Sequence, residues 1–215
     1  GMTAADFVNA ATYNMEERYT AYTKGSQTPS TPQTPSGTTV PPSGARIRLC
    51  IEADQRAGSL LDALERTNGW ATFYCTPEFM ENNGDLLRRL AVSGSAVGLL
   101  LDPEDPAESL DQQLKRGNDA LYRATLTRTR LVYAGGGEET LQALEQLGYS
   151  CLTPDMDRTD YKLESAANAA ALLKRVSARR RDVSVWLGTT ASAAGVKEVV
   201  SSAQREGHYC RAMTE

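Results

Sequence analysis

Seven short apolar runs, separated by stretches with helical periodicity, set the pattern of the chain from Ala45 onward. The runs cover residues 47–51, 71–75, 96–101, 130–133, 149–152, 183–187 and 208–211. Between them, apolar residues recur at helical spacing in six groups: Leu60, Leu61 and Leu64; Leu86, Leu87 and Leu90; Leu110, Leu114 and Leu121; Leu141, Leu144 and Leu147; residues 167–176; and residues 196–203. Strand and helix in repeated succession predict parallel strands joined by crossover helices.

The strand runs are apolar at consecutive positions rather than at every second position. Such runs are typical of a sheet that is buried on both faces. The order of elements fits either a doubly wound sheet or a small, irregular β/α barrel of seven strands, so the predicted fold class is α/β.

Residues 1–44 follow a different pattern. Over residues 3–24, apolar side chains recur three or four positions apart, which predicts a helix with an apolar, tyrosine-rich face. Residues 26–44 are mostly Thr, Pro and Ser and carry no charge, and such a stretch cannot bury enough surface to order itself. We therefore expect a helix in residues 1–25, a linker at 26–44 and a folded domain at 45–215.

Linker composition also bears on location. Thr/Pro/Ser linkers commonly separate modules of exported proteins, so we expect an extracytoplasmic, secreted or cell-envelope protein; a cytosolic protein with a polar spacer is the alternative. Gly1 before Met2 looks like a residue left by a tag. We expect the helix at 3–24 to follow an anchor or another module, and to dock on a partner or on its own domain.

The composition excludes several classes of function. The 215 residues carry 23 Lys and Arg against 27 Asp and Glu, a formal net charge of −4, which argues against nucleic acid as a partner. No apolar run approaches the roughly 20 residues that a membrane helix needs. His208 is the only histidine, so a metal site with two or three imidazoles from this chain is excluded.

The four cysteines, Cys50, Cys75, Cys151 and Cys210, lie in or beside apolar runs and form no Cys-x-x-Cys pair. We interpret them as small buried apolar residues. A disulfide between neighbouring strands is the alternative, which spacing alone does not decide.

Several segments resemble one enzyme family in uninterrupted order. The segments are GWATFY (69–74), DLLRRLA (85–91), GSAVG (94–98), ETLQAL with LGY (139–149) and DRTDY (157–161). Together they resemble the polysaccharide deacetylase (NodB-homology, carbohydrate esterase family 4) family over residues 45–213. The resemblance implies a distorted β/α barrel with its site at the carboxyl ends of the strands.

The same resemblance implies a reaction, but most of the residues for it are replaced. Family members remove acetyl groups from sugars with a divalent metal held by one Asp and two His, and a second Asp acts as base. At the matching positions, Ala53 replaces the Asp ligand, Leu100 and Glu104 replace the two His, and Gly188 replaces a catalytic His. We therefore predict no metal and no cofactor.

Other motif positions keep part of their chemistry. Glu52 retains a carboxylate at the position of the base, and Asp54 stands one place after the lost ligand. Asp157 and Asp160 are kept, whereas Tyr161 replaces a Trp. Residues 133–136, YAGG, replace the family's Arg-Pro-Pro-Tyr, and their glycines indicate a strand-to-helix turn rather than a phosphate loop.

Three hypotheses follow. In the first, the domain is an inactive deacetylase-like fold that binds glycan or peptidoglycan through Tyr133, Gly135, Gly136 and Tyr161, with Glu52, Asp54, Glu104, Asp157 and Asp160 as remnants of the site. In the second, carboxylates at Glu52, Asp54, Asp102, Glu104, Asp105, Asp155 and Asp157 form a rebuilt hydrolytic site, as in a deacetylase or glycosidase. In the third, the protein is a scaffold that assembles through residues 3–24. Trp186 is either a sugar-stacking ring or, as we prefer, a core residue.

Overall fold

A computed structural model describes residues 44–157, 162–179 and 181–215. The helix predicted at 3–24, and the linker apart from Gly44, lie outside the described residues. Asp160 and Tyr161 also lie outside them.

One parallel sheet forms the centre of the domain. Its strands are β1 (Arg46–Glu52), β2 (Thr72–Cys75), β3 (Ala96–Leu101), β4 (Leu131–Ala134), β5 (Ser150–Cys151), β6 (Val183–Gly188) and β7 (Tyr209–Cys210). The strand order is β5-β4-β3-β2-β1-β6, with β7 paired to the first residues of β1. The predicted seven parallel strands are confirmed, although β5 is shorter than the run at 149–152.

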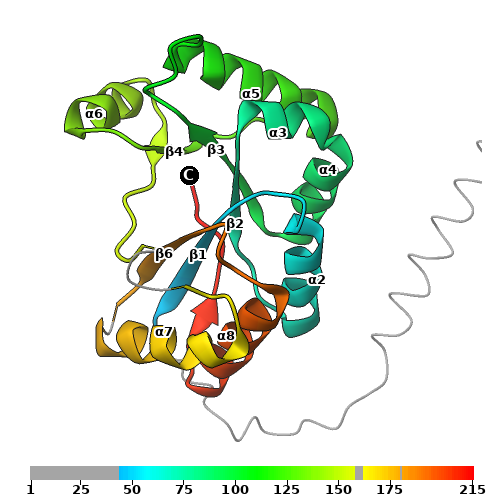
Figure 1. Cartoon of the computed structure of the whole chain (residues 1–215), viewed down its shortest axis with the longest axis vertical. Coiled ribbons are helices and arrows are strands. Elements are labelled where there is room, and N and C mark those ends of the chain that lie inside the picture. Colours follow the sequence, from blue (N-terminus) through cyan, green and yellow to red (C-terminus); the bar gives the residue numbers. More distant parts are fainter. Residues whose placement is uncertain (1–43, 158–161, 180) are drawn as a thin grey trace, which may run out of the picture. The chain divides into compact units, whose positions relative to one another are not determined.

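Helices surround the sheet on its outer side (Figure 1). They are α2 (Ala57–Thr67), α3 (Pro77–Asn82), α4 (Gly84–Ser93), α5 (Leu110–Thr125), α6 (Glu138–Gln146), α7 (Ala166–Arg179) and α8 (Ala193–Arg205). Periodicity did not predict the short α3. It begins because the Thr76 hydroxyl accepts a hydrogen bond from the Phe79 N–H (3.1 Å) and Pro77 occupies the first helical position.

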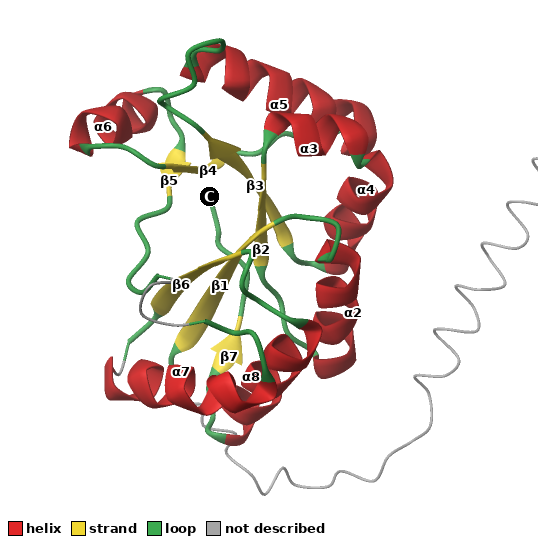
Figure 2. Ribbon diagram, viewed as in Figure 1, coloured by secondary structure: helices red, strands yellow, loops and turns green. Residues whose placement is uncertain are grey.

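The sheet curls into a half-barrel rather than lying open, as the ring of strands in Figure 2 shows. After β5, the chain crosses toward β6, where Met156 forms a parallel bridge with Val185. The Trp186 N–H donates to the Met156 carbonyl at 2.8 Å. Residues 152–157 thus partly close the gap between the two edge strands, and the distorted β/α barrel is the fold observed.

Two apolar layers lie on the two faces of the strands. The outer layer packs between strands and helices, with Leu49, Ile51, Phe73 and Val185 among its fully buried members. The inner layer comprises Cys50, Tyr74, Leu131, Leu152 and Trp186, with Ala96, Leu100, Tyr133 and Met213 packed against it. Because both faces are buried, the strands need apolar residues at consecutive positions.

Aromatic rings dominate the inner layer. The ring centroids of Tyr133 and Trp186 are 4.3 Å apart, and Tyr74 lies edge-on to Trp186 at 5.8 Å. Tyr74 fits because position 98 is glycine: a Cβ on Gly98 would come 2.5 Å from the Tyr74 ring. Trp186 is 6% exposed, which confirms its interpretation as a core residue.

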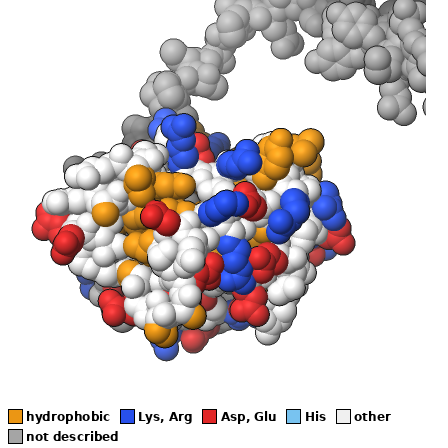
Figure 3. Space-filling view, turned by 90° about the horizontal axis from the view of Figure 1, so that it is seen from above, with side chains coloured by type: hydrophobic (Ala, Val, Ile, Leu, Met, Phe, Trp, Pro, Cys, Tyr) orange, Lys and Arg blue, Asp and Glu red, His pale blue; other side chains and the backbone are white. Residues whose placement is uncertain are grey.

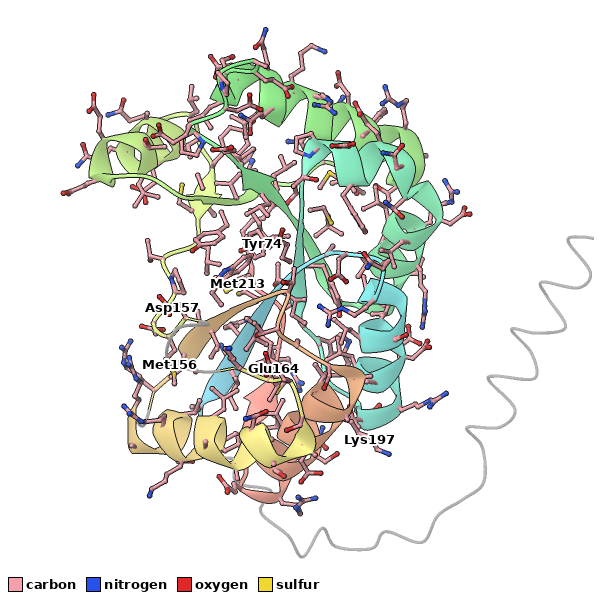
Figure 4. The ribbon with its side chains drawn as sticks, in the orientation of Figure 1. Tyr74, Met156, Asp157, Glu164, Lys197 and Met213 are labelled. Carbon is pink, nitrogen blue, oxygen red and sulfur yellow. The ribbon has the colours of Figure 1, made fainter. Side chains whose placement is uncertain are left out.

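The last residues enter the ring of strands near the start of β1. The Met213 N–H donates to the Thr72 hydroxyl at 2.8 Å, and the Arg130 N–H donates to the Glu215 carboxylate at 2.7 Å. Figure 4 shows Met213 close to Tyr74 inside the ring. This return of the chain covers the amino-terminal side of the inner layer.

All four cysteines are free thiols. Cys50, Cys75 and Cys210 are buried as predicted, whereas Cys151 is only half-buried. Burial raises the pKa of Cys50, Cys75 and Cys210 to about 12 in each case. These thiols are therefore protonated at neutral pH and unreactive.

Candidate functional site

A groove of about 940 Å³ opens at the carboxyl ends of β1, β2, β3 and β4. We call it the carboxyl-end groove. It is lined by Glu52, Thr76, Pro77, Glu78, Leu100, Leu101, Asp102, Pro103, Glu104, Asp105, Glu108, Gln113, Arg116, Gly135 and Gly136. Parallel strands end side by side at this edge, which is where barrel enzymes place their sites.

Glu52 is the last residue of β1 and reaches the groove half-buried. No hydrogen bond or ion pair joins its carboxylate to another described residue, so the group is available to a ligand. The next residue turns away: the Ala53 N–H donates to the Tyr74 carbonyl at 2.9 Å, and the Ala53 methyl packs in the outer layer.

Asp54 is engaged outside the groove. Its carboxylate accepts a hydrogen bond from the Arg56 backbone N–H at 2.8 Å and forms an ion pair with the Arg56 guanidinium at 3.0 Å. Arg56 also donates to the Thr189 carbonyl, next to Gly188. The carboxylate therefore fixes the turn before α2 and joins it to the end of β6.

The loop between β3 and α5 forms one wall of the groove. Leu100 packs against the inner layer, whereas Glu104 is exposed. The Asp102 carboxylate accepts a hydrogen bond from the Glu104 N–H at 2.9 Å, which orders the turn.

Gln113 holds this wall in place. Its side chain is 3% exposed and makes three hydrogen bonds to loop backbone: it accepts from the Asp102 N–H at 2.8 Å and donates to the Asp102 carbonyl at 2.7 Å and the Glu108 carbonyl at 3.0 Å. Sequence reasoning missed Gln113. The Ser109–Gln112 capping box was the available signal, because it fixes the start of α5 and hence the inward direction of position 113.

Arg116 is the only basic residue among the described residues that line the groove, and sequence reasoning missed it too. It binds Glu81 through two nitrogens at 2.8 and 2.9 Å and Glu108 through a third at 2.8 Å. The hydrogen bond from Arg116 lowers the pKa of Glu81, and the hydrogen bond to Glu81 raises the pKa of Arg116. Since Arg116 is committed to these partners, the remaining carboxylates leave the groove acidic.

The glycine loop after β4 forms the opposite wall. Gly136 has a φ of 136°, and a Cβ there would lie 3.3 Å from both Pro103 and Thr140, so the position suits glycine alone. The first turn of α6 carries Glu138 and Glu139, which disfavour an anion at that helix terminus. Gly135 and Gly136 are thus placed to offer backbone groups to a neutral or cationic ligand.

The other predicted positions lie outside the groove lining. Tyr133 belongs to the inner aromatic layer, and Asp157 lies on the segment that follows Met156. The structure therefore brings Glu52, Glu104, Gly135 and Gly136 to one groove, and it places Asp54 and Tyr133 elsewhere.

His208 lies at the other end of the strands. Its Nδ1 accepts a hydrogen bond from the Ala45 N–H at 2.9 Å, and its Nε2 lies 3.1 Å from the Ser177 hydroxyl. Since Nδ1 is an acceptor, Nε2 carries the proton and donates to Ser177. The imidazole joins α7, β1 and the approach to β7, and it takes no part in the groove.

The donor set of the groove does not fit the metal centre that the fold implies. Among the described residues, no group of three His, Cys, Asp or Glu side chains is arranged to hold a metal ion. Ala53 and Leu100, which stand where the family resemblance places metal ligands, have no donor atom. We therefore derive no metal-dependent step for this groove.

Outside the groove, the surface charge and the hydropathy of the helices also bear on function. On the face seen in Figure 3, basic side chains lie among acidic ones. Ion pairs such as Lys115–Asp119 and Arg89–Glu65 are exposed on the surface of the domain. Within the described part of the chain, no helix combines the length and apolarity that a membrane crossing requires.

Solved structures of carbohydrate esterases share this fold. A mutant of a peptidoglycan deacetylase from Bacillus subtilis is 17% identical, with a TM-score of 0.65 over 80% of this chain and 89% of its own. A family 4 carbohydrate esterase from Streptomyces lividans, solved with acetate, is 16% identical, with a TM-score of 0.63 over 80% and 93%. Identities this low establish the fold alone.

A third similar structure is a mutant of a family 4 pseudoenzyme whose enzymatic activity was restored. It is 17% identical, with a TM-score of 0.63 over 80% of this chain and 67% of its own. By sequence, no protein-family model matches the chain, and no curated protein is significantly similar to it.

Proposed function

We propose that the domain is a deacetylase-like fold that no longer hydrolyses acetyl groups and instead binds glycan or a cell-wall polymer in the carboxyl-end groove. One observation carries the proposal: the groove is retained, while two of its metal-ligand positions are the donor-free Ala53 and Leu100. A hydrolytic metal centre therefore lacks its ligands, whereas a surface for sugar hydroxyls remains.

The groove favours particular glycans. The unpaired carboxylate of Glu52 and the exposed carboxylate of Glu104 can accept hydrogen bonds from hydroxyl or amino groups. Backbone groups at Gly135 and Gly136 add contacts on the other wall. Because the groove is acidic, a sugar with free amino groups should bind more tightly than an acidic sugar. The glycine-rich wall remains our proposed ligand contact in the groove. Tyr133 and Tyr161 stay predicted contacts outside its lining, since Tyr133 packs against the inner layer and Tyr161 lies outside the described residues.

The proposal also bears on where the protein acts. Two of the solved structures that share this fold are peptidoglycan deacetylases. Together with the Thr/Pro/Ser composition of residues 26–44, this supports an extracytoplasmic site of action. Docking of residues 3–24 on a partner or on the domain stays a prediction, which a comparison of oligomeric state with and without residues 1–44 would test.

Calorimetry with oligomers of glucosamine, N-acetylglucosamine and peptidoglycan fragments tests the binding. We expect saturable binding of at least one glycan, weakened about fivefold to tenfold by Glu52→Gln combined with Glu104→Gln. The matched control is Glu145→Gln, which removes an exposed carboxylate from the last turn of α6, outside the groove. Silence across the panel would overturn glycan binding.

Activity is assayed in parallel by acetate release from acetylated glycans with added divalent metal. We expect none above background. Acetate release that is lost in Glu52→Gln would instead favour the second hypothesis, a hydrolase rebuilt on carboxylates.

A further inference from the structure

A second cavity, of about 570 Å³, lies at the opposite end of the strands. We call it the amino-end cavity. Arg46 and Arg48 of β1 line it together with Trp70, which precedes β2, and with Arg211 and Met213 of the returning chain. None of the described residues that line it is acidic. In a chain with a net charge of −4, three guanidinium groups around one cavity form a local concentration of positive charge.

Two of these arginines are half-buried and have no carboxylate partner among the described residues. The Arg48 guanidinium donates to the Ala212 carbonyl. The Arg211 guanidinium donates to the Cys210 carbonyl at 3.2 Å and lies 4.5 Å above the Trp70 ring and 5.0 Å from the Tyr209 ring. These partners hold the side chains in place but neutralise neither charge.

Arg46 differs from the other two. It is exposed and lies 3.9 Å from Asp182, a distance at which a solvated ion pair contributes little. Partly desolvated cations without counter-charges are unfavourable, and an anion that reaches Arg48 and Arg211 would offset that cost. The cavity volume is within the usual range for a small-molecule site.

We infer that the amino-end cavity binds a small phosphate-bearing ligand. The planar guanidinium matches two phosphate oxygens at once, and Arg is the residue that most often makes such contacts. The Trp70 ring is fixed by its indole N–H, which donates to the Ser93 carbonyl at 3.1 Å, so a rigid apolar wall stands beside the arginines. Met213 adds a second apolar surface. The ligand would therefore carry an organic group next to its phosphate. This inference does not rest on the proposed glycan function.

Pyrophosphate and inorganic phosphate serve as probes, titrated into the full chain by calorimetry at low salt. We expect saturable binding of pyrophosphate, tighter than that of phosphate, with backbone amide shifts in NMR spectra confined to residues 46–48, 70 and 211–214. Arg211→Gln should weaken pyrophosphate binding about tenfold or more, and Arg211→Lys less than Arg211→Gln.

Arg205→Gln is the matched control, because Arg205 is exposed on α8 and pairs with Glu198 at 3.2 Å, away from the cavity. Thermal unfolding without ligand shows whether each variant folds. Should Arg211→Gln fail to fold, Arg48→Gln and the shift map of the unaltered protein still decide the question. Absence of saturable pyrophosphate binding, or equal weakening by Arg205→Gln, would overturn the inference.

Discussion

The two ends of the half-barrel differ in charge and in how they are built. Among the described residues, six carboxylates and one arginine line the carboxyl-end groove, and three arginines and no carboxylate line the amino-end cavity. The loop anchored by Gln113 and the glycine loop after β4 form the walls of the first, whereas the starts of strands and the returning chain form the second. The same strands thus present two chemistries, separated by the inner aromatic layer.

This difference indicates at which end of the strands side chains can be substituted without loss of the fold. Loops at the carboxyl ends of strands contribute little to the core, so the side chains that they carry can change while the barrel is kept. At the amino ends, the residues that line the cavity also stabilise the fold. Some take part in strand pairing, and Arg48 and Arg211 make hydrogen bonds to the backbone. A ligand there would therefore be coupled to the stability of the domain.

The largest expected effect comes from removing the layer that separates the two ends. Trp186→Ala leaves a cavity between Tyr74 and Tyr133, so the free energy of unfolding should fall by about 3–5 kcal/mol. Urea denaturation measures it. Tyr122→Ala is the control, because Tyr122 is 40% exposed. Similar losses for both variants would mean that the inner layer is not a packed core.

A smaller effect should be confined to the carboxyl-end groove. Gln113→Ala leaves the Asp102 backbone groups without their partners, so the free energy of unfolding should fall by about 1–3 kcal/mol. Glycan binding should weaken, while pyrophosphate binding at the other end stays unchanged. Gln142→Ala on the exposed face of α6 is the comparison variant. If both ligands lost affinity in Gln113→Ala, the two ends would not be independent.

The smallest expected effect concerns Asp155, on the segment that crosses to β6. Burial would raise the pKa of Asp155, but the hydrogen bond from the Ser184 N–H and the charge of Arg181 outweigh burial and lower the pKa below its ordinary value. A lowered folded-state pKa stabilises the protein above the unfolded-state pKa, and the contribution is lost as the pH falls through the folded-state pKa.

Asp155→Asn should therefore reduce the free energy of unfolding by less than about 1 kcal/mol at neutral pH, and by less still as the pH falls through the lowered folded-state pKa of Asp155. Thermal unfolding across a pH series measures the difference, with Asp85→Asn as the control at a fully solvated position. A difference that grew as the pH fell would contradict the assigned direction.

Much of the fold could be predicted because both faces of the strands are buried. Consecutive apolar residues, as at Leu49 to Ile51, mark such strands directly in the sequence. The short α3 was missed because Thr76 and Pro77, rather than periodicity, specify it. The two-residue β5 is shorter than its apolar run because the chain leaves β4 there to reach β6.

The candidate site was predictable only in part. Glu52, Glu104 and the glycines meet because parallel strands end at one edge, a property of the topology. Asp54 lies outside the groove because its carboxylate accepts a hydrogen bond from the Arg56 N–H in a local turn. Gln113 and Arg116 both reach the groove from α5, and no local sequence pattern predicts their contacts. The amino-end cavity depends on contacts between residues far apart in the sequence, such as that between Arg48 and Ala212, which local patterns do not predict either.

The pairing of β7 with β1 has a consequence for the order of folding. Arg46 and Ile47 pair with Tyr209 and Cys210, so the pairing of β1 is completed by residues far along the sequence. A chain emerging from the ribosome holds β1 long before its last partner exists. Contacts of such high sequence separation form slowly, because the closure entropy of the whole intervening chain must be overcome. The domain should therefore reach its native state only after β7 has been synthesised, and until then the start of β1 and the amino-terminal side of the inner layer stay exposed to chaperones or to misfolding.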